Sequence, residues 1–150
     1  MTLNRRMPPP LRSMGDFQIV RPECSRMKNG MPLNVIRAGS QEVVRLDILI
    51  GGGQWHQTQA LQALFTNRML REGTTTMTSA QIAEKLDYYG AWLELSSAVN
   101  YGFITLYSLN KYFPSTLAII SDMLMNPAFP EKELEVVVES NRQQFLVNST

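Results

Sequence analysis

The segment from Glu42 to Ile50 places an apolar side chain at every second position, and this alternation limits the fold more than any other feature of the sequence. The residues on its regular face are Val44, Leu46, Ile48 and Ile50. A period of two residues is that of a strand with one buried face, because successive side chains point to opposite sides of a sheet. The chain must therefore build a sheet with one covered face, and the rest of the sequence has to supply the cover.

Two hairpins are predicted around short turns. Asn29-Gly30 is a strong signal for a two-residue turn between a strand over 17–20 and a return strand over 32–36. Farther along, residues 91–97 and 103–109 keep the two-residue period on either side of a turn. These segments predict antiparallel pairing.

Four segments carry apolar residues at helical spacing. They cover residues 61–73, 78–90, 113–126 and 130–148. Gly73 and Gly90 stand where C-terminal caps belong, and Thr78 with Gln81 forms a capping-box pattern. The order of elements predicts an α+β fold, a largely antiparallel sheet with helices on one face.

Composition narrows the class of partner. The 150 residues are 44% hydrophobic, enough for one sizeable core, and 14 Lys and Arg against 13 Asp and Glu leave a net charge of +1. That balance gives no basic surface for nucleic acid. The longest apolar runs, such as 117–120 and 136–138, are far shorter than the roughly 20 residues of a membrane span. We therefore expect neither nucleic acid nor membrane as a partner.

The first residues and the single cysteine indicate the cellular compartment in which the protein is expected. Residues 1–15 mix Arg, Pro, Ser and Met without periodicity and are expected to form a mobile arm before a domain over 16–150. Pro8, Pro9 and Pro10 stand where a signal peptide needs an apolar stretch. Cys24 has no partner for an internal disulfide, which agrees with a reducing compartment. The cytoplasm is the expected location.

Two sequence features exclude particular mechanisms and ligands. His56 is the only histidine, so no mechanism that needs two imidazoles fits inside this chain. The run Gly51–Gly53 lacks the Gly-Lys-Ser/Thr of a phosphate loop and the spacing of a dinucleotide fingerprint. It is interpreted as the exit of a strand.

Four segments in order resemble a known family. They are Arg68–Thr74, the helix start Thr78–Ala83, Leu86 with Gly90, and Met123–Pro127 with Phe129. This series resembles the pitrilysin/insulinase zinc metallopeptidases, which carry an inverted H-x-x-E-H motif followed by H-M-L-x-x-G-T and later L-L-x-N-P-x-F segments. The resemblance runs from about Phe17 to Phe145. It implies the first part of a metallopeptidase-like domain, truncated relative to the family.

The resemblance also locates a degenerate motif. In the family, two His one helical turn apart bind zinc and an adjacent Glu takes a proton from the metal-bound water. The corresponding positions here are Leu64, Asn67 and Arg68, none of which suits its role. The third ligand position falls at or near Glu139, the one residue suitable as a ligand, unless it is an ordinary surface acid or a partner of Arg68. We therefore expect no zinc and no cofactor.

The family also binds extended peptides by adding them to the edge of the strand after its second helix. Here that strand is 92–97, and the resemblance makes Glu94, Leu95, Ser96 and Ser97 the candidate substrate contacts. The alternative is that Trp92 and Leu95 are simply core residues.

The function implied by the resemblance is that of a catalytically inactive subunit that pairs with a homologous zinc-bearing subunit and helps to enclose peptide substrate. Two alternatives stay open: an active zinc endopeptidase whose ligands come from elsewhere, and a peptide-binding scaffold module. Because the family domain continues with further elements, this chain is expected to expose a sheet edge and a helix face, and to self-associate.

Overall fold

The computed structural model describes residue 15 and residues 18–149. The chain divides into two compact units, residues 1–41 and residues 42–150. The mobile arm expected over residues 1–15 falls, apart from Gly15, outside the described residues.

The first unit contains a two-stranded antiparallel hairpin. Strand β1, Glu23–Arg26, pairs with β2, Pro32–Val35, around a turn in which Gly30 has φ +84°. The predicted turn is thus confirmed, but the strand predicted over 17–20 is wrong, because Ile19 and Val20 lie outside any strand. The return strand β2 has four residues, so it pairs with the four residues that lie equally far before the turn, residues 23–26.

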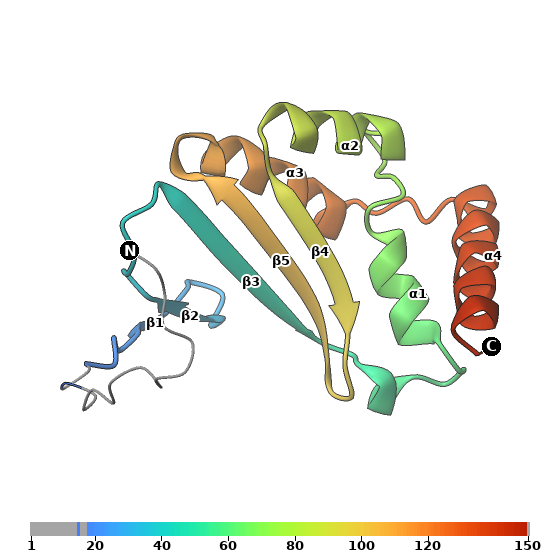
Figure 1. The fold of residues 1–150 in the computed structure, drawn as a ribbon, viewed down its shortest axis with the longest axis horizontal. Coiled ribbons are helices and arrows are strands. Elements are labelled where there is room, and N and C mark those ends of the chain that lie inside the picture. Colours follow the sequence, from blue (N-terminus) through green and yellow to red (C-terminus); the bar gives the residue numbers. More distant parts are fainter. Residues whose placement is uncertain (1–14, 16–17, 150) are drawn as a thin grey trace, which may run out of the picture. The chain divides into compact units, whose positions relative to one another are not determined.

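The second unit is built on a three-stranded antiparallel sheet (Figure 1). Strand β5, Tyr101–Leu109, lies between β3, Val43–Gly51, and β4, Trp92–Ser97. In its register Leu106 lies opposite Leu46 on one side and Leu93 on the other. The alternation read from the sequence is confirmed, and it puts Leu46, Leu93 and Leu106 of the three strands on the same, core-facing side.

Helices cover that face, so the expected α+β architecture is confirmed (Figure 1). The helices are α1, Gln62–Met69; α2, Ser79–Tyr88; α3, Phe113–Met125; and α4, Glu131–Asn148. The core joins Ile104 and Leu106 of β5 to side chains of α2 and α3. Those two strand residues are 2% and 1% exposed. Helix α4 contributes no buried residue.

The helix ends follow the sequence signals with one exception. Thr78 and Gln81 form the predicted capping box, and Gly90 has φ +60°. Helix α1, however, ends at Met69 rather than at Gly73. The N–H groups of residues 70–72 donate to carbonyls three residues earlier, as in a 3-10 turn. Gly73, with φ +147°, then turns the chain into a loop and pairs with Thr78 in an isolated bridge.

The glycine run after β3 is a structural junction. The N–H groups of Gly52 and Gly53 donate to Asn100 O at 3.4 and 3.2 Å, and those of the next two residues donate to Ala98 O and Val99 O. These amides are therefore occupied by the carbonyls of the β4–β5 turn and are not free to hold a phosphate. This agrees with the interpretation of the run as the exit of a strand.

A methyl group at Gly53 should be poorly tolerated. Its Cβ would press on Ala98 O and lie 2.5 Å from Tyr101 N, both of them backbone atoms that move little. We expect Gly53→Ala to lower the free energy of unfolding by about 3 kcal/mol. Gly51→Ala is the matched control, because its Cβ would meet nothing within 4 Å. Urea denaturation measures both, and equal stabilities would contradict the packing described for Gly53.

Candidate functional site

Helix α1 carries the three positions that the sequence marks as a degenerate motif. Leu64 and Arg68 are one turn apart and share a helix face, and Asn67 precedes Arg68. The helix lies between β4 and α4 (Figure 1). Asn67 therefore faces the sheet, and Arg68 reaches the last helix.

Asn67 is buried and bonded to the sheet. Only 7% of it is exposed, and its Nδ2 donates to Ser96 O at 2.5 Å and, more weakly, to Phe103 O at 3.4 Å. Gly102 leaves room for the amide, since a Cβ there would lie 3.1 Å from Nδ2. Among the described residues the buried Oδ1 has no hydrogen-bond partner. The side chain thus ties the helix to the β4–β5 pair.

Arg68 is half-buried and bonded to α4. Its Nη1 donates to Asn141 Oδ1 at 2.7 Å, a short bond of the charge-assisted kind. This is the position that the resemblance assigns to the family's second His. Here a fixed positive charge and a neutral amide occupy the space between the two helices.

Glu139 does not reach α1. Its Oε1 accepts from Gln143 Nε2 at 2.7 Å and its Oε2 from Arg142 Nη1 at 3.5 Å, both one turn farther along α4. These partners, Gln143 foremost, hold the pKa of the exposed carboxyl below its usual range. The α4 side chain that bonds Arg68 is that of Asn141, two positions later, and no sequence signal indicated it.

The residues brought together here do not fit a zinc ion. Leu64 has no donor atom, Arg68 repels a cation, and Asn141 is already bonded to Arg68. His56 lies in a short 3-10 helix, Gln54–His56, ahead of α1. Within residues 18–149 no group of three or more His, Cys, Asp or Glu could hold a metal.

A hollow of about 410 Å³ opens beside another face of α1. Its wall from the helix and its C-cap consists of Gln62, Ala63, Thr66, Asn67 and Leu70, and the remaining lining is mostly apolar. His56 is the one titratable residue in the lining. The hollow therefore offers no pair of groups for acid–base catalysis.

The candidate peptide contacts lie on β4, which is an edge strand. The N–H of Ala98 donates to Tyr101 O at 2.8 Å, which marks a hydrogen-bonded pair of the hairpin. Bonded and non-bonded pairs alternate along an antiparallel ladder, so Leu95 and Ser97 direct their N–H and C=O away from β5. Glu94 and Ser96 direct theirs into the sheet and expose their side chains. The four predicted contacts thus divide into two kinds.

A glycine in a strand could have revealed part of this site. Gly102 lies within β5, and an interior strand glycine often marks a place where another group approaches closely. Here the approaching group is the Asn67 amide. No comparable signal marks Asn141, because a polar residue on a helix is common.

Fold and site together define an α+β domain whose helix α1 carries no His, Cys, Asp or Glu. The chain belongs to the insulinase family, described as "Insulinase (Peptidase family M16)", which matches residues 35–148. The family assignment suggested by the sequence is confirmed.

Two curated relatives carry names of enzymes. An uncharacterized zinc protease of Rickettsia bellii (strain RML369-C) is 28% identical over 116 residues, and the uncharacterized zinc protease YmxG of Bacillus subtilis (strain 168) is 24% identical over 110. The matches cover 73% and 72% of this chain but only 27% of each relative. The chain thus spans about a quarter of their length.

Solved structures share the fold at low sequence identity. A peptidase M16 inactive domain from Pseudomonas fluorescens matches with a TM-score of 0.75 and 20% identity, over 81% of this chain and 30% of that one. A protease from Helicobacter pylori matches with a TM-score of 0.73 and 14% identity, over 85% and 32%. Within the described residues, no helix is long and apolar enough to cross a membrane.

Proposed function

We propose that this chain is a noncatalytic, zinc-free member of the insulinase family that pairs with a homologous zinc-bearing subunit and helps to enclose a peptide substrate. The observation that carries the proposal is the bonding of Asn67, the residue that the resemblance assigns to the family's catalytic Glu. Its amide donates to Ser96 O inside the fold instead of meeting solvent. A buried amide that cannot titrate does not activate water.

The part proposed for β4 is to receive an extended peptide. The edge groups of Leu95 and Ser97 supply backbone hydrogen bonds, and the exposed side chains of Glu94 and Ser96 contact the peptide beside them. Backbone pairing depends little on residue type. The strand would therefore hold a peptide without strong sequence selection.

The proposal extends to the whole protein. Residues 16–150 are taken as the first part of a domain that continues in longer relatives, in keeping with the 27% of each relative that is matched. The likeness to a peptidase M16 inactive domain supports a noncatalytic role. A cytoplasmic location is proposed on the lone Cys24, which has no partner for an internal disulfide.

One alternative has an observation in its favour. The Rickettsia bellii and Bacillus subtilis relatives are both named as zinc proteases, which favours an active zinc endopeptidase. For this chain such an enzyme would need ligands from another chain or segment, because Leu64, Asn67 and Arg68 supply none. A peptide-binding scaffold that meets no peptidase is the remaining alternative.

Metal analysis and copurification separate the three functions. We expect the purified, dialysed chain to retain no stoichiometric zinc, because Glu139 alone cannot provide tetrahedral coordination. We also expect the tagged chain to copurify from its own cells with a homologue that carries an intact H-x-x-E-H and zinc, and to raise the peptide hydrolysis of that homologue.

The other outcomes decide against the proposal. About one zinc per chain together with hydrolysis by the chain alone would establish the active endopeptidase. Peptide binding without any zinc-bearing homologue would establish the scaffold. Full activity of the homologue in the absence of this chain would also end the proposal of a working pair.

A further inference from the structure

The turn between β1 and β2 places an asparagine directly before a glycine. Gly30 N donates to Met27 O at 2.9 Å and Met27 N donates to Met31 O at 2.9 Å, so Lys28, Asn29 and Gly30 form the tip of the hairpin. Gly30 has φ +84°, and a Cβ there would meet nothing within 4 Å. There is therefore room beside Gly30 for another group to approach its backbone nitrogen.

The side chain of Asn29 is folded back onto the chain that follows it. Its Oδ1 accepts from Met31 N at 3.1 Å, an Asx-turn bond that turns Cγ toward the Gly30 peptide. A hydrogen bond to Oδ1 also draws electron density from Cγ, and it stabilises the negative charge that develops on this oxygen when a nucleophile attacks. The side-chain amide is thus both positioned and polarised for attack.

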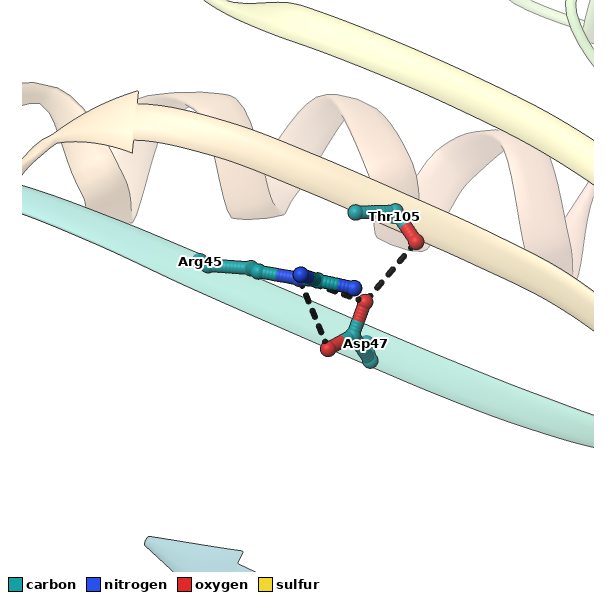
Figure 2. Close-up of polar contacts among 3 residues, drawn as sticks. All are labelled: Arg45, Asp47 and Thr105. Atoms are coloured by element: carbon teal, nitrogen blue, oxygen red, sulfur yellow. Dashed lines mark hydrogen bonds and ion pairs between the residues drawn. The ribbon is translucent and has the colours of Figure 1, made fainter. Parts of the chain in front are cut away.

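A carboxyl group on the sheet of the second unit is held differently. Figure 2 shows Asp47 of β3, whose Oδ1 accepts from Thr105 Oγ1 at 2.8 Å and whose Oδ2 lies 2.9 Å from Arg45 Nε. The next residue, Ile48, is paired with β5 in the ladder. Asp47 therefore cannot turn onto the backbone nitrogen that follows it without breaking contacts of the sheet, whereas Asn29 is bonded within its own turn.

Solvent reaches the tip of the hairpin. Residues 28–30 are exposed, and within β1 and β2 only Val35 is half-buried. A two-stranded hairpin with so little buried surface is marginally stable, so the bond from Gly30 N to Met27 O opens easily and frees the nitrogen. The Asx-turn bond needs only residues 29–31 and does not depend on the rest of the hairpin.

Positive charge lies beside this peptide. Arg26 Nη1 donates to Gly30 O at 3.0 Å, and Lys28 lies two positions before Gly30. The acid of β1, Glu23, lies at the opposite end of the hairpin, where it pairs with Arg37 at 3.2 Å. A cation near the Gly30 amide favours the loss of its proton, because it stabilises the negative charge that remains.

We propose that Asn29 is a site of spontaneous covalent modification, at which the side-chain amide is lost and isoaspartate forms. Hydroxide takes the proton of Gly30 N, and this nitrogen attacks Asn29 Cγ to close a succinimide ring. The Nδ2 leaves as ammonia with a proton from water. Water then opens the ring: cleavage at Cγ gives aspartate, and cleavage of the original peptide bond leaves the chain linked through Cγ, as isoaspartate. No group is oxidised or reduced.

The product changes the hairpin. Isoaspartate adds one carbon atom to the main chain between β1 and β2, and the turn that sets their register is lost. The modification concerns the first unit alone. It goes beyond the proposed function and is independent of the β4 edge and of any zinc-bearing partner.

Ageing of the full 150-residue chain at mildly alkaline pH tests the proposal. Peptide mapping by mass spectrometry detects the loss of ammonia and separates isoaspartate from aspartate. Asn34, an exposed asparagine on β2, is the reference within the same unit. We expect the product to accumulate at Asn29 at least about tenfold faster than at Asn34.

Two comparisons separate the turn from the sequence and the attacking atom from general strain. The rate at Asn29 should be no lower in the folded chain than in the urea-unfolded chain, because the bond from Met31 N polarises the amide. Gly30→Ala should slow the reaction about tenfold, since its Cβ crowds the attacking nitrogen. Gly39→Ala is the matched control: Gly39 has φ +94° and equally open surroundings, but it follows an alanine.

Three results would overturn the proposal. Loss of ammonia at Asn29 no faster than at Asn34 would do so. A lower rate in the folded chain than in the unfolded chain would show that the turn protects Asn29. Equal rates in Gly30→Ala and Gly39→Ala would exclude attack by the Gly30 nitrogen.

Discussion

At pH 7 the variant Asn67→Asp is expected to be about 3–5 kcal/mol less stable than the wild type, the range for a buried charge without a partner. Asp has nearly the shape of Asn, so packing is preserved and only the hydrogen bonding changes. An oxygen replaces the Nδ2 that donates to Ser96 O and Phe103 O. The introduced carboxylate would face two carbonyl oxygens in a site of which 7% is exposed.

The loss should depend on pH in a defined direction. In the unfolded chain the introduced carboxyl titrates near its usual pKa of about 3.9. In the folded chain burial and the two carbonyl oxygens raise its pKa, because they disfavour the charged form. The penalty therefore appears as the pH rises above about 4 and grows until the raised pKa is passed. At lower pH the protonated carboxyl donates to Ser96 O, and stability returns.

Urea denaturation of Asn67→Asp at pH 4 and pH 7 measures the effect. Thr66→Asp is the matched control, since it adds the same charge to an exposed neighbour on α1 and should change the stability by no more than about 0.5 kcal/mol. If Asn67→Asp were as stable as this control at pH 7, the bond from Asn67 to the sheet would be refuted. The same geometry predicts that Asn67→Glu, which restores the family's catalytic residue, destabilises the fold.

The second large effect is a gain of zinc binding. The combination Leu64→His, Arg68→His and Asn141→Glu puts two imidazoles and a carboxylate where α1 meets α4, at the contact now made by Arg68 and Asn141. We expect it to bind zinc at least about 100-fold more tightly than the two-His variant that lacks Asn141→Glu, since even outer-shell ligand partners change affinity by 10- to 100-fold. Competition with a chromophoric chelator gives both affinities.

The two-His variant also tests the role of Glu139. It keeps Glu139, so equal affinity of the two variants would show that Glu139 reaches the metal and that Asn141 does not mark the third ligand position. We expect metal binding without turnover in either variant, because Asn67 remains and no base is placed beside the metal. Peptide hydrolysis by the two-His variant would contradict the proposed alignment of the motif.

Much of the fold was predictable because a buried strand or helix face needs apolar residues at the period of that element. The alternation in β3 and the capping box of α2 depend only on residues close together in the sequence, and the structure contains both the strand and the cap. The failed strand over 17–20 shows the limit of such rules, because β propensity alone does not say which residues lie at equal distance from the Asn29-Gly30 turn. Pairing geometry decided that strand.

The site was predictable in its residues but not in its contacts. The positions of Leu64, Asn67 and Arg68 came from a resemblance, whereas the partner of the Asn67 amide is a backbone carbonyl, which any residue type provides. Counting along the chain placed the distal position at Glu139. The rotation of α4 against α1, set by how the two helices pack, brings Asn141 rather than Glu139 into contact with Arg68. The spacing of residues along the chain does not determine that rotation.

Helix α4 has a consequence for how this molecule opens. None of its 18 residues is buried, and the bond from Arg68 to Asn141 ties it to α1. Such an element is expected to have a low free energy of local unfolding. Strand β5 and its neighbours are expected to unfold only together with the whole unit. In this chain the helix beside Arg68 is thus the element whose amides we expect to exchange with solvent faster than those of β5.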